Sequence, residues 1–312
     1  MHLNGVPTHM NYTKVLTLAV GAVVGSSLVA YALGEFDGHA HVWLTDSLVG
    51  TKILNEQGDT VGKIEDIVVS PRQASSYVVV SLASWAAMPD KLLAIPWTVI
   101  RTIEPDPQIK DSQRTLALTV DKATLRTAPS FASNAWPDMT ESNWGRDVDA
   151  FYHTALTAKG ADKRPANESR PAEAAARNKV ITWKSTDLQG ADVMTKTKEK
   201  LGDIEEVAVD TDGRFCYVAI SVGGFLGIGE RMVAVPWDAL QFSLAGAKND
   251  TKLITLDSTK EQLGRAPEYS NADEDRARMC DPEWIKSVYD HFSIAPYWNT
   301  NKASKASGTV GK

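Results

Sequence analysis

VGKIEDIVV at residues 61–69 and LGDIEEVAV at residues 201–209 decide the fold through their likeness to each other. The second stretch follows the first by 140 residues, and the offset holds without a gap for about fifty residues. It also aligns YVVVS at 77–81 with YVAIS at 217–221, and AIPW at 94–97 with AVPW at 234–237. Self-similarity at a fixed spacing is the mark of a repeat architecture. The chain is therefore a tandem duplication.

Each repeat has the sequence pattern of short β-strands. Runs such as KIEDIVVS, SYVVVSL and FCYVAISV are rich in valine and isoleucine and are separated by turn residues. Asp212 and Gly213 predict a two-residue hairpin turn, because glycine reaches positive φ at little cost. Five or six short strands per repeat, followed by helical segments, favour a small closed β-barrel. The predicted fold class is mainly β, with two such barrels in tandem and an N-terminal hydrophobic helix.

Helix signals occur at the end of the second repeat. Ser258 and Glu261 have the spacing of a capping box, and Pro267 ends that helix. Asp281 followed by Pro282 predicts the start of the last helix, with a capping side chain and a proline in the first turn.

Both repeats resemble the PRC-barrel family, named for a domain of the photosynthetic reaction centre. The family's outline has an early glycine, a GxIxDxxVD strand, a YVVVxVGGFLGIG hairpin and a VAVPW corner. The second repeat matches this outline almost throughout, at Gly190, Gly202, Ile204, Glu206, Asp210, Tyr217, Val222 through Gly229, and Val233 through Trp237. The first repeat matches at Gly50, Gly62, Ile64, Asp66, Tyr77 and Ala94 through Trp97, but has Ala83, Ser84, Ala87 and Pro89 where the hairpin glycines would stand.

The resemblance implies an adaptor or binding module, as in the reaction-centre H subunit and the ribosome maturation factor, with no shared catalytic residue and no cofactor. We therefore expect a non-catalytic binding or scaffolding protein and not an enzyme. The alternative is a membrane-anchored accessory subunit of a photosynthetic or respiratory electron-transfer complex. The acidic character of both repeats, within a net charge of -6, disfavours a nucleic-acid partner.

The N-terminal segment, residues 1–32, predicts export. Lys14 precedes an apolar stretch from Val15 to Ala32 that ends in a small-x-small pattern at Ala30 and Ala32, typical of signal-peptidase cleavage. A retained membrane anchor is the competing interpretation, and the Gly21 and Gly25 pair is compatible with it. Either way, Lys14 before the stretch places the rest of the chain in the periplasm or on the periplasmic face of the inner membrane. The expected partner there is a protein.

The remaining chain divides by composition. We predict a first barrel with a helical tail at 42–153 and a linker at 154–180, rich in alanine, proline and charge. A second barrel with its tail follows at 181–298, and the last residues, 299–312, form a disordered tail.

Candidate functional residues are few. The glycine-rich loop lacks the Lys-Ser/Thr pair of a phosphate loop and is not followed by a helix, so it predicts a wide hairpin. It is also the candidate partner-binding hairpin, because exposed apolar side chains on a hairpin mark an interface. The alternative is that these side chains fold back over the barrel mouth. Its residues are Gly223, Gly224, Phe225, Leu226, Gly227, Ile228 and Gly229.

The other candidates favour structural roles. Asp37, His39 and His41 are a weak metal-ligand set, and the calcium-like start at Asp210 is interrupted by Arg214. His153 and His291 lack a nearby nucleophile pattern. Glu65 and Glu205 are expected to face solvent by strand alternation. Cys216 and Cys280 either pair or, as the favoured interpretation, stay isolated. We expect no catalytic, cofactor or metal site.

Overall fold

The computed structural model describes residues 42–70, 75–88, 90–103, 114–139, 144–158, 181–223, 231–245, 251–270, 272 and 275–296. The predicted N-terminal hydrophobic helix and the C-terminal tail lie outside this part of the chain, as does most of the predicted linker. No helix among the described residues is long and apolar enough to cross a membrane. The predicted domain boundaries stay predictions.

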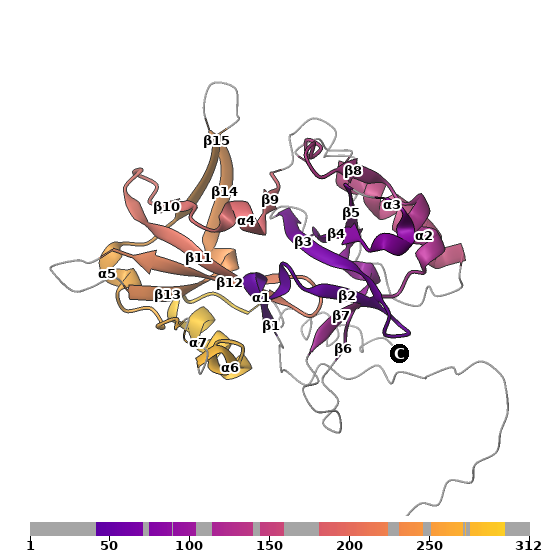
Figure 1. Cartoon of the computed structure of the whole chain (residues 1–312). Helices are drawn as coiled ribbons and strands as arrows, with labels where there is room; N and C mark the ends of the chain where they lie inside the picture. Colours follow the sequence, from indigo (N-terminus) through magenta and orange to yellow (C-terminus); the bar gives the residue numbers. More distant parts are fainter. Residues whose placement is uncertain are drawn as a thin grey trace, which may run out of the picture. The chain divides into compact units, whose positions relative to one another are not determined.

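Each repeat contributes one twisted sheet, which confirms the mainly β class (Figure 1). The first sheet has the order β6-β7-β2-β3-β4-β5-β8. Its strands are β2 (Lys52–Asn55), β3 (Thr60–Ser70), β4 (Ser75–Leu82), β5 (Lys91–Pro96), β6 (Ile100–Ile103), β7 (Thr115–Leu118) and β8 (Ser130–Ala132). Its short helices are η1 (Ser84–Ala86), η2 (Trp97–Val99) and α2 (Lys122–Thr127), and α3 (Trp144–Ala158) follows them.

The second sheet repeats this arrangement in the order β13-β12-β11-β10-β15-β14. Its strands are β10 (Asp192–Met194), β11 (Lys200–Asp210), β12 (Phe215–Val222), β13 (Arg231–Pro236), β14 (Leu240–Ala245) and β15 (Thr251–Leu256). The helices are η4 (Trp237–Ala239), α5 (Lys260–Leu263), α6 (Arg276–Met279) and α7 (Pro282–His291). In both sheets one pair is parallel, β2 with β7 and β10 with β15, and the others are antiparallel.

The expectation of closed barrels needs correction. Among the described strands, neither sheet is closed by pairing between its two end strands. The Pro-Trp corner gives the physical reason: β5 ends at Pro96 and β13 at Pro236, and a 3-10 turn follows each proline directly. That turn directs the next strand onto β7 or β15 and away from the preceding strand.

Gly62 and Gly202 occupy matching positions where two strands approach closely. A Cβ at Gly62 would overlap the carbonyl oxygen of Ser81, and one at Gly202 would overlap that of Ser221. Just beyond each glycine, β3 and β11 carry a bulge, at Glu65 and Glu205. A bulge bends a strand sharply, so the repeated glycine permits the bend that wraps each sheet.

Two local predictions, the length of the loop at Gly213 and the residues that cap α5, were each wrong by one residue. The hairpin at Gly213 has three loop residues and not two, because Asp210 and Arg214 are still hydrogen-bonded to each other (2.8 Å) and Gly213 alone takes positive φ, +79°. The capping box of α5 is formed by Thr259 and Gln262 and not by Ser258. The cap of α7 is confirmed, since the Asp281 carboxylate accepts hydrogen bonds from two backbone amides of the first turn.

The two repeats exchange strands. The first described strand, β1 (Val42–Leu44), precedes the first repeat but pairs with β11 of the second. The strand that precedes the second repeat, β9 (Trp183–Lys184), pairs with β3 of the first. Each is followed by a one-turn helix, α1 (Thr45–Leu48) or α4 (Ser185–Leu188) (Figure 1). One apolar core therefore contains buried side chains from both repeats.

Candidate functional site

The exchange is reciprocal and nearly symmetric. Leu44 lies opposite Ala208, and its counterpart Lys184 lies opposite Val68. Both pairs are related by the same 140-residue offset as the sequence repeat. Because the two registers match, β1 pairs with β11 in the same way as β9 pairs with β3. This junction is the largest structural feature that the sequence repeat alone did not predict.

A buried carboxylate anchors each exchanged segment. Asp66 on β3 accepts hydrogen bonds from the hydroxyls of Ser185 (2.8 Å) and Thr186 (2.5 Å) at the start of α4. At the matching place, Glu206 on β11 accepts from the hydroxyl of Thr45 (3.1 Å) at the start of α1. Buried carboxylates are costly unless they are hydrogen-bonded, so these contacts fix the position of each segment.

The two anchors differ in one charge. Where the second segment has the Thr186 hydroxyl, the first has Asp46, whose backbone amide approaches Glu206 at 3.4 Å. The pKa of Glu206 is raised to about 7, chiefly by burial and also by the negative charge of Asp46, although the hydrogen bond from the backbone amide of Val207 opposes this rise. The first anchor therefore carries a like-charge conflict that the second does not have.

The Pro-Trp corner of the first repeat also contacts the second repeat. The indole Nε1 of Trp97 donates to the carbonyl oxygen of Thr211 (2.9 Å), and the Ser76 hydroxyl donates to that of Gly213 (2.5 Å). A Cβ at Gly213 would overlap the Trp97 ring. The turn that the calcium-like pattern marked is thus a contact surface, and it lies between the repeats.

Tryptophans of the exchanged strands are covered by cations. The Arg114 guanidinium lies over the Trp43 ring, 5.4 Å from its centroid, and the Lys252 amine lies 4.7 Å from the Trp183 centroid. In each case the cation belongs to the repeat that follows the strand in the chain, and not to the repeat whose sheet the strand joins. Such cation–π contacts add to the hydrogen bonds that hold the strand.

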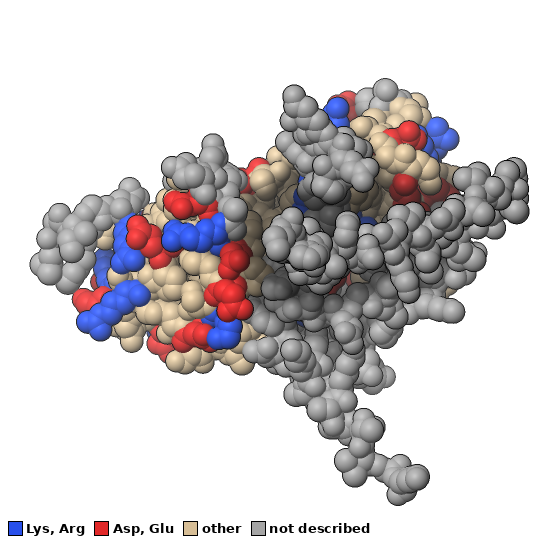
Figure 2. Space-filling model, turned by 90° about the horizontal axis from the view of Figure 1, so that it is seen from below, with Lys and Arg blue, Asp and Glu red and all other residues tan. Residues whose placement is uncertain are grey.

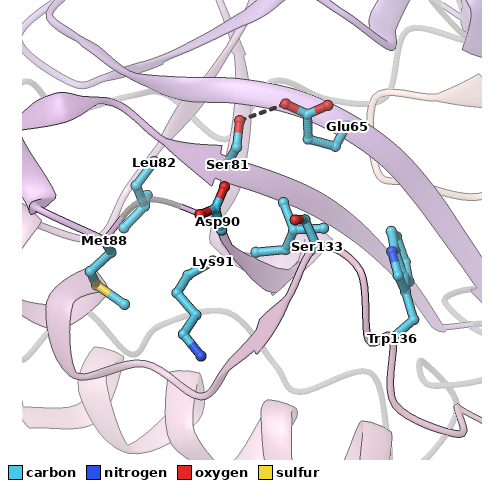
Figure 3. A pocket seen from close by; sticks show the side chains of 9 residues that line it. Glu65, Ser81, Leu82, Met88, Asp90, Lys91, Ser133 and Trp136 are labelled. Atoms are coloured by element: carbon cyan, nitrogen blue, oxygen red, sulfur yellow. Dashed lines mark hydrogen bonds between the residues drawn. The ribbon is translucent and has the colours of Figure 1, made fainter.

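The described chain also contains a groove of about 390 Å³ in the first repeat (Figure 3). It is lined by Glu65, Ser81, Leu82, Met88, Asp90, Lys91, Leu92, Ser133 and Trp136. The Ser81 hydroxyl donates to the Glu65 carboxylate (2.6 Å), and the Lys91 amine points away from that carboxylate. The lining therefore mixes both charges with a partly exposed tryptophan.

Among the residues that line this groove, no histidine accompanies Ser81, although Glu65, Asp90 and Lys91 are titratable. Ser81 donates to a carboxylate, whereas an activated serine is paired with a base such as histidine. Within the described residues, His153 and His291 lie on α3 and α7 and do not line the groove. No group of three or more potential metal ligands occurs in that part of the chain.

The sequence candidates have mixed outcomes. Of the predicted hairpin only Gly223 is described, with open space around its α-carbon, and residues 224–229 lie outside the described residues. Asp37, His39 and His41 also lie outside them. Cys216 and Cys280 are not joined in a disulfide. Glu205 is exposed as expected, whereas Glu65 is half-buried against Ser81.

The first repeat shows its own version of the hairpin region. Trp85 in η1 donates its indole N–H to the carbonyl oxygen of Val61 (2.9 Å), and both Lys122 and Arg126 lie over its ring. In this repeat, an aromatic side chain folds back over its own sheet.

Sequence reasoning missed Asp66 and Glu206 as the residues that join the repeats. A signal was present: both are acidic, both stand in otherwise apolar strands, and the repeat offset relates them. Each directly follows another acidic residue, Glu65 or Glu205. Strand alternation therefore predicts that one member of each pair faces inward. It does not indicate which groups would hydrogen-bond to the buried carboxylate.

Surface charge is mixed. Figure 2 shows Lys and Arg side chains interspersed with Asp and Glu on the face of the second repeat that it displays. In the second repeat, Lys200 forms ion pairs with Asp192 and Asp203, both at 2.7 Å. This face shows no extended basic area of the kind that binds nucleic acid.

A family model described as PRC-barrel domain matches residues 44–123 and again residues 184–263, together just over half of the chain. The chain belongs to the PRC-barrel family. Comparison with curated proteins finds no match. PRC-barrel domains are generally binding or scaffolding modules, and the family is not an enzyme family.

Each PRC match begins inside an exchanged strand, at Leu44 and at Lys184. The family pattern thus assigns each exchanged segment to the repeat that follows it in the chain. In the structure that segment docks on the opposite repeat. The two PRC repeats are therefore complementary halves of one unit.

Proposed function

We propose that this chain is a non-catalytic binding or scaffolding protein of the bacterial cell envelope, in which two PRC repeats present their surfaces as one body. The observation that carries this proposal is the reciprocal exchange, because the buried carboxylates Asp66 and Glu206 are used to hold the repeats together. Hydrogen-bonded carboxylates that join the two repeats give a partner a fixed surface to bind.

Export is supported by the sequence alone. The apolar segment after Lys14, with its cleavage pattern, would deliver the repeats to the periplasm or to the periplasmic face of the inner membrane. A protein partner in the envelope follows from that location and from the family's general role. The groove at Lys91 and Trp136 is the proposed contact surface, because it combines charge with a partly exposed aromatic ring.

The proposal is tested by cross-linking the tagged full-length chain in intact cells and identifying the proteins captured from the envelope fraction. Lys91→Glu should reduce capture by tenfold or more, whereas Lys198→Glu, at an exposed lysine of the second repeat that does not line the groove, should leave it unchanged. Recovery of the chain in the cytoplasm would contradict the location. Equal capture by the wild type and Lys91→Glu would remove the groove from the contact surface.

A further inference from the structure

The segment Val42–Leu48 continues into the first sheet at its C-terminal end, and Arg114 of the first repeat also contacts the Trp43 ring and the Val42 carbonyl oxygen. Beyond Leu48, the chain turns at Gly50, which has φ +90° and whose N–H donates to the carbonyl oxygen of Ile64 (2.8 Å). From that turn onward the chain forms the first sheet, whereas β1 lies on the second. A change of direction at this turn, with release of the Arg114 contacts, moves the segment.

The second repeat supplies a strand edge, an apolar cluster and a buried carboxylate to this segment. The edge of β11 pairs with β1 from Ala208 to Asp210. The side chains of Val42 and Leu44 are buried in an apolar cluster otherwise formed by the second repeat. Glu206 accepts the Thr45 hydroxyl. The second repeat thus recognises the backbone of the strand, its two apolar side chains and the Thr45 hydroxyl. These contacts are the same whichever copy of the chain supplies the segment.

The other exchanged segment is held differently. β9 and α4 lie in the interior of the chain, between the first repeat and β10, so their displacement must move chain on both sides. At the positions that match Val42 and Leu44, the chain has Thr182, just before β9, and Lys184. The hydroxyls of Ser185 and Thr186 both contact Asp66 at 2.8 Å or less. The interior position and the shorter hydrogen bonds favour a segment that stays within its own chain.

We propose that the partner of the β11 edge includes a second copy of this chain, and that two copies form a dimer by exchanging their Val42–Leu48 segments. Each segment then docks on β11 of the other copy, with Leu44 opposite the partner copy's β11. Such an interface is twofold symmetric and closes on itself. The β11, apolar and Glu206 contacts of the monomer are kept, so concentration sets the balance between monomer and dimer. This inference does not depend on the proposed envelope function.

The test uses a cysteine pair that reports which chain supplies the segment. Leu44→Cys with Ala208→Cys, in a full-length chain with Cys216→Ala and Cys280→Ala, joins two directly opposed residues. After refolding at increasing chain concentration and oxidation, non-reducing electrophoresis separates an internal bridge from a covalent dimer. We expect the dimer-to-monomer ratio to rise about tenfold for each tenfold rise in concentration while dimer is the minor species.

The matched control places cysteines at the other exchange, Val68→Cys with Lys184→Cys, which are also directly opposed. This pair should give the internal bridge at every concentration. Mixing tagged and untagged copies of the first pair should give a mixed dimer. An internal bridge alone, at all concentrations, would overturn the exchange between copies. Failure of the first pair to form any bridge would overturn the pairing of Leu44 with Ala208 on which the proposal rests.

Discussion

Glu206 gives the junction a calculable dependence on pH. Its pKa is raised from 4.5 to about 7 in the folded chain, first by burial and then by Asp46. A carboxyl whose folded pKa is raised binds its proton more tightly when folded, so its contribution favours folding at low pH and is lost as pH rises from 4.5 towards 7. At about 1.36 kcal/mol per pKa unit, the loss is about 3 kcal/mol.

Glu206→Gln removes this titration while keeping a carbonyl oxygen for the Thr45 hydroxyl. We expect the variant to gain stability relative to the wild type as pH rises, by about 3 kcal/mol between about pH 4 and pH 8. The assay is urea unfolding followed by tryptophan fluorescence at a series of pH values. Glu205→Gln, on the exposed neighbour, is the matched control and should keep the wild-type pH dependence.

The reasoning would be refuted if Glu206→Gln and the wild type lost stability in parallel over this range. It would also be refuted if the wild type became more stable relative to the variant as pH rose, because that sign requires a lowered folded pKa.

Three further substitutions test individual contacts. Gly202→Ala should cost about 2 kcal/mol or more of the free energy of unfolding in urea, because the added Cβ meets a backbone carbonyl. Gly223→Ala, where the added Cβ meets open space, should change it by no more than about 0.5 kcal/mol. Equal costs would contradict the close approach at Gly202. Trp97→Phe should cost about 1 kcal/mol by the same assay through loss of the hydrogen bond to the second repeat, and a neutral result would count against that contact. Asp281→Ala should lower stability by about 1 kcal/mol through loss of the α7 cap, measured as the shift in thermal midpoint, and an unchanged midpoint would show that the cap is dispensable.

The fold class could be predicted because its signals are local or internal to the sequence. Valine-rich runs indicate strands, and the constant offset shows two copies of one unit. The repeated Gly62 and Gly202 mark a backbone approach that tolerates no side chain. Local errors at Gly213 and Thr259 arose because neighbouring residues have nearly equal turn and capping chemistry.

The junction could not be predicted in the same way. A strand carries no label for the sheet it joins, and β1 and β9 have the apolar and aromatic residues that would suit either repeat. Asp66 and Glu206 looked like members of two symmetric acidic pairs, and only the docking of Ser185 and Thr45 shows why they are buried. Long-range pairing depends on tertiary contacts that single-chain patterns do not contain.

The central claim is that the two PRC repeats form one cooperative unit through exchanged strands. Native-state hydrogen exchange of an Ile220→Ala variant, read separately for amides of β3 and β11, tests it most directly. Ile220 is fully buried in the second repeat, so the change should cost about 2–5 kcal/mol. The account predicts that protection falls by the same free energy in both strands. Protection that falls in β11 while β3 keeps its wild-type value would contradict it.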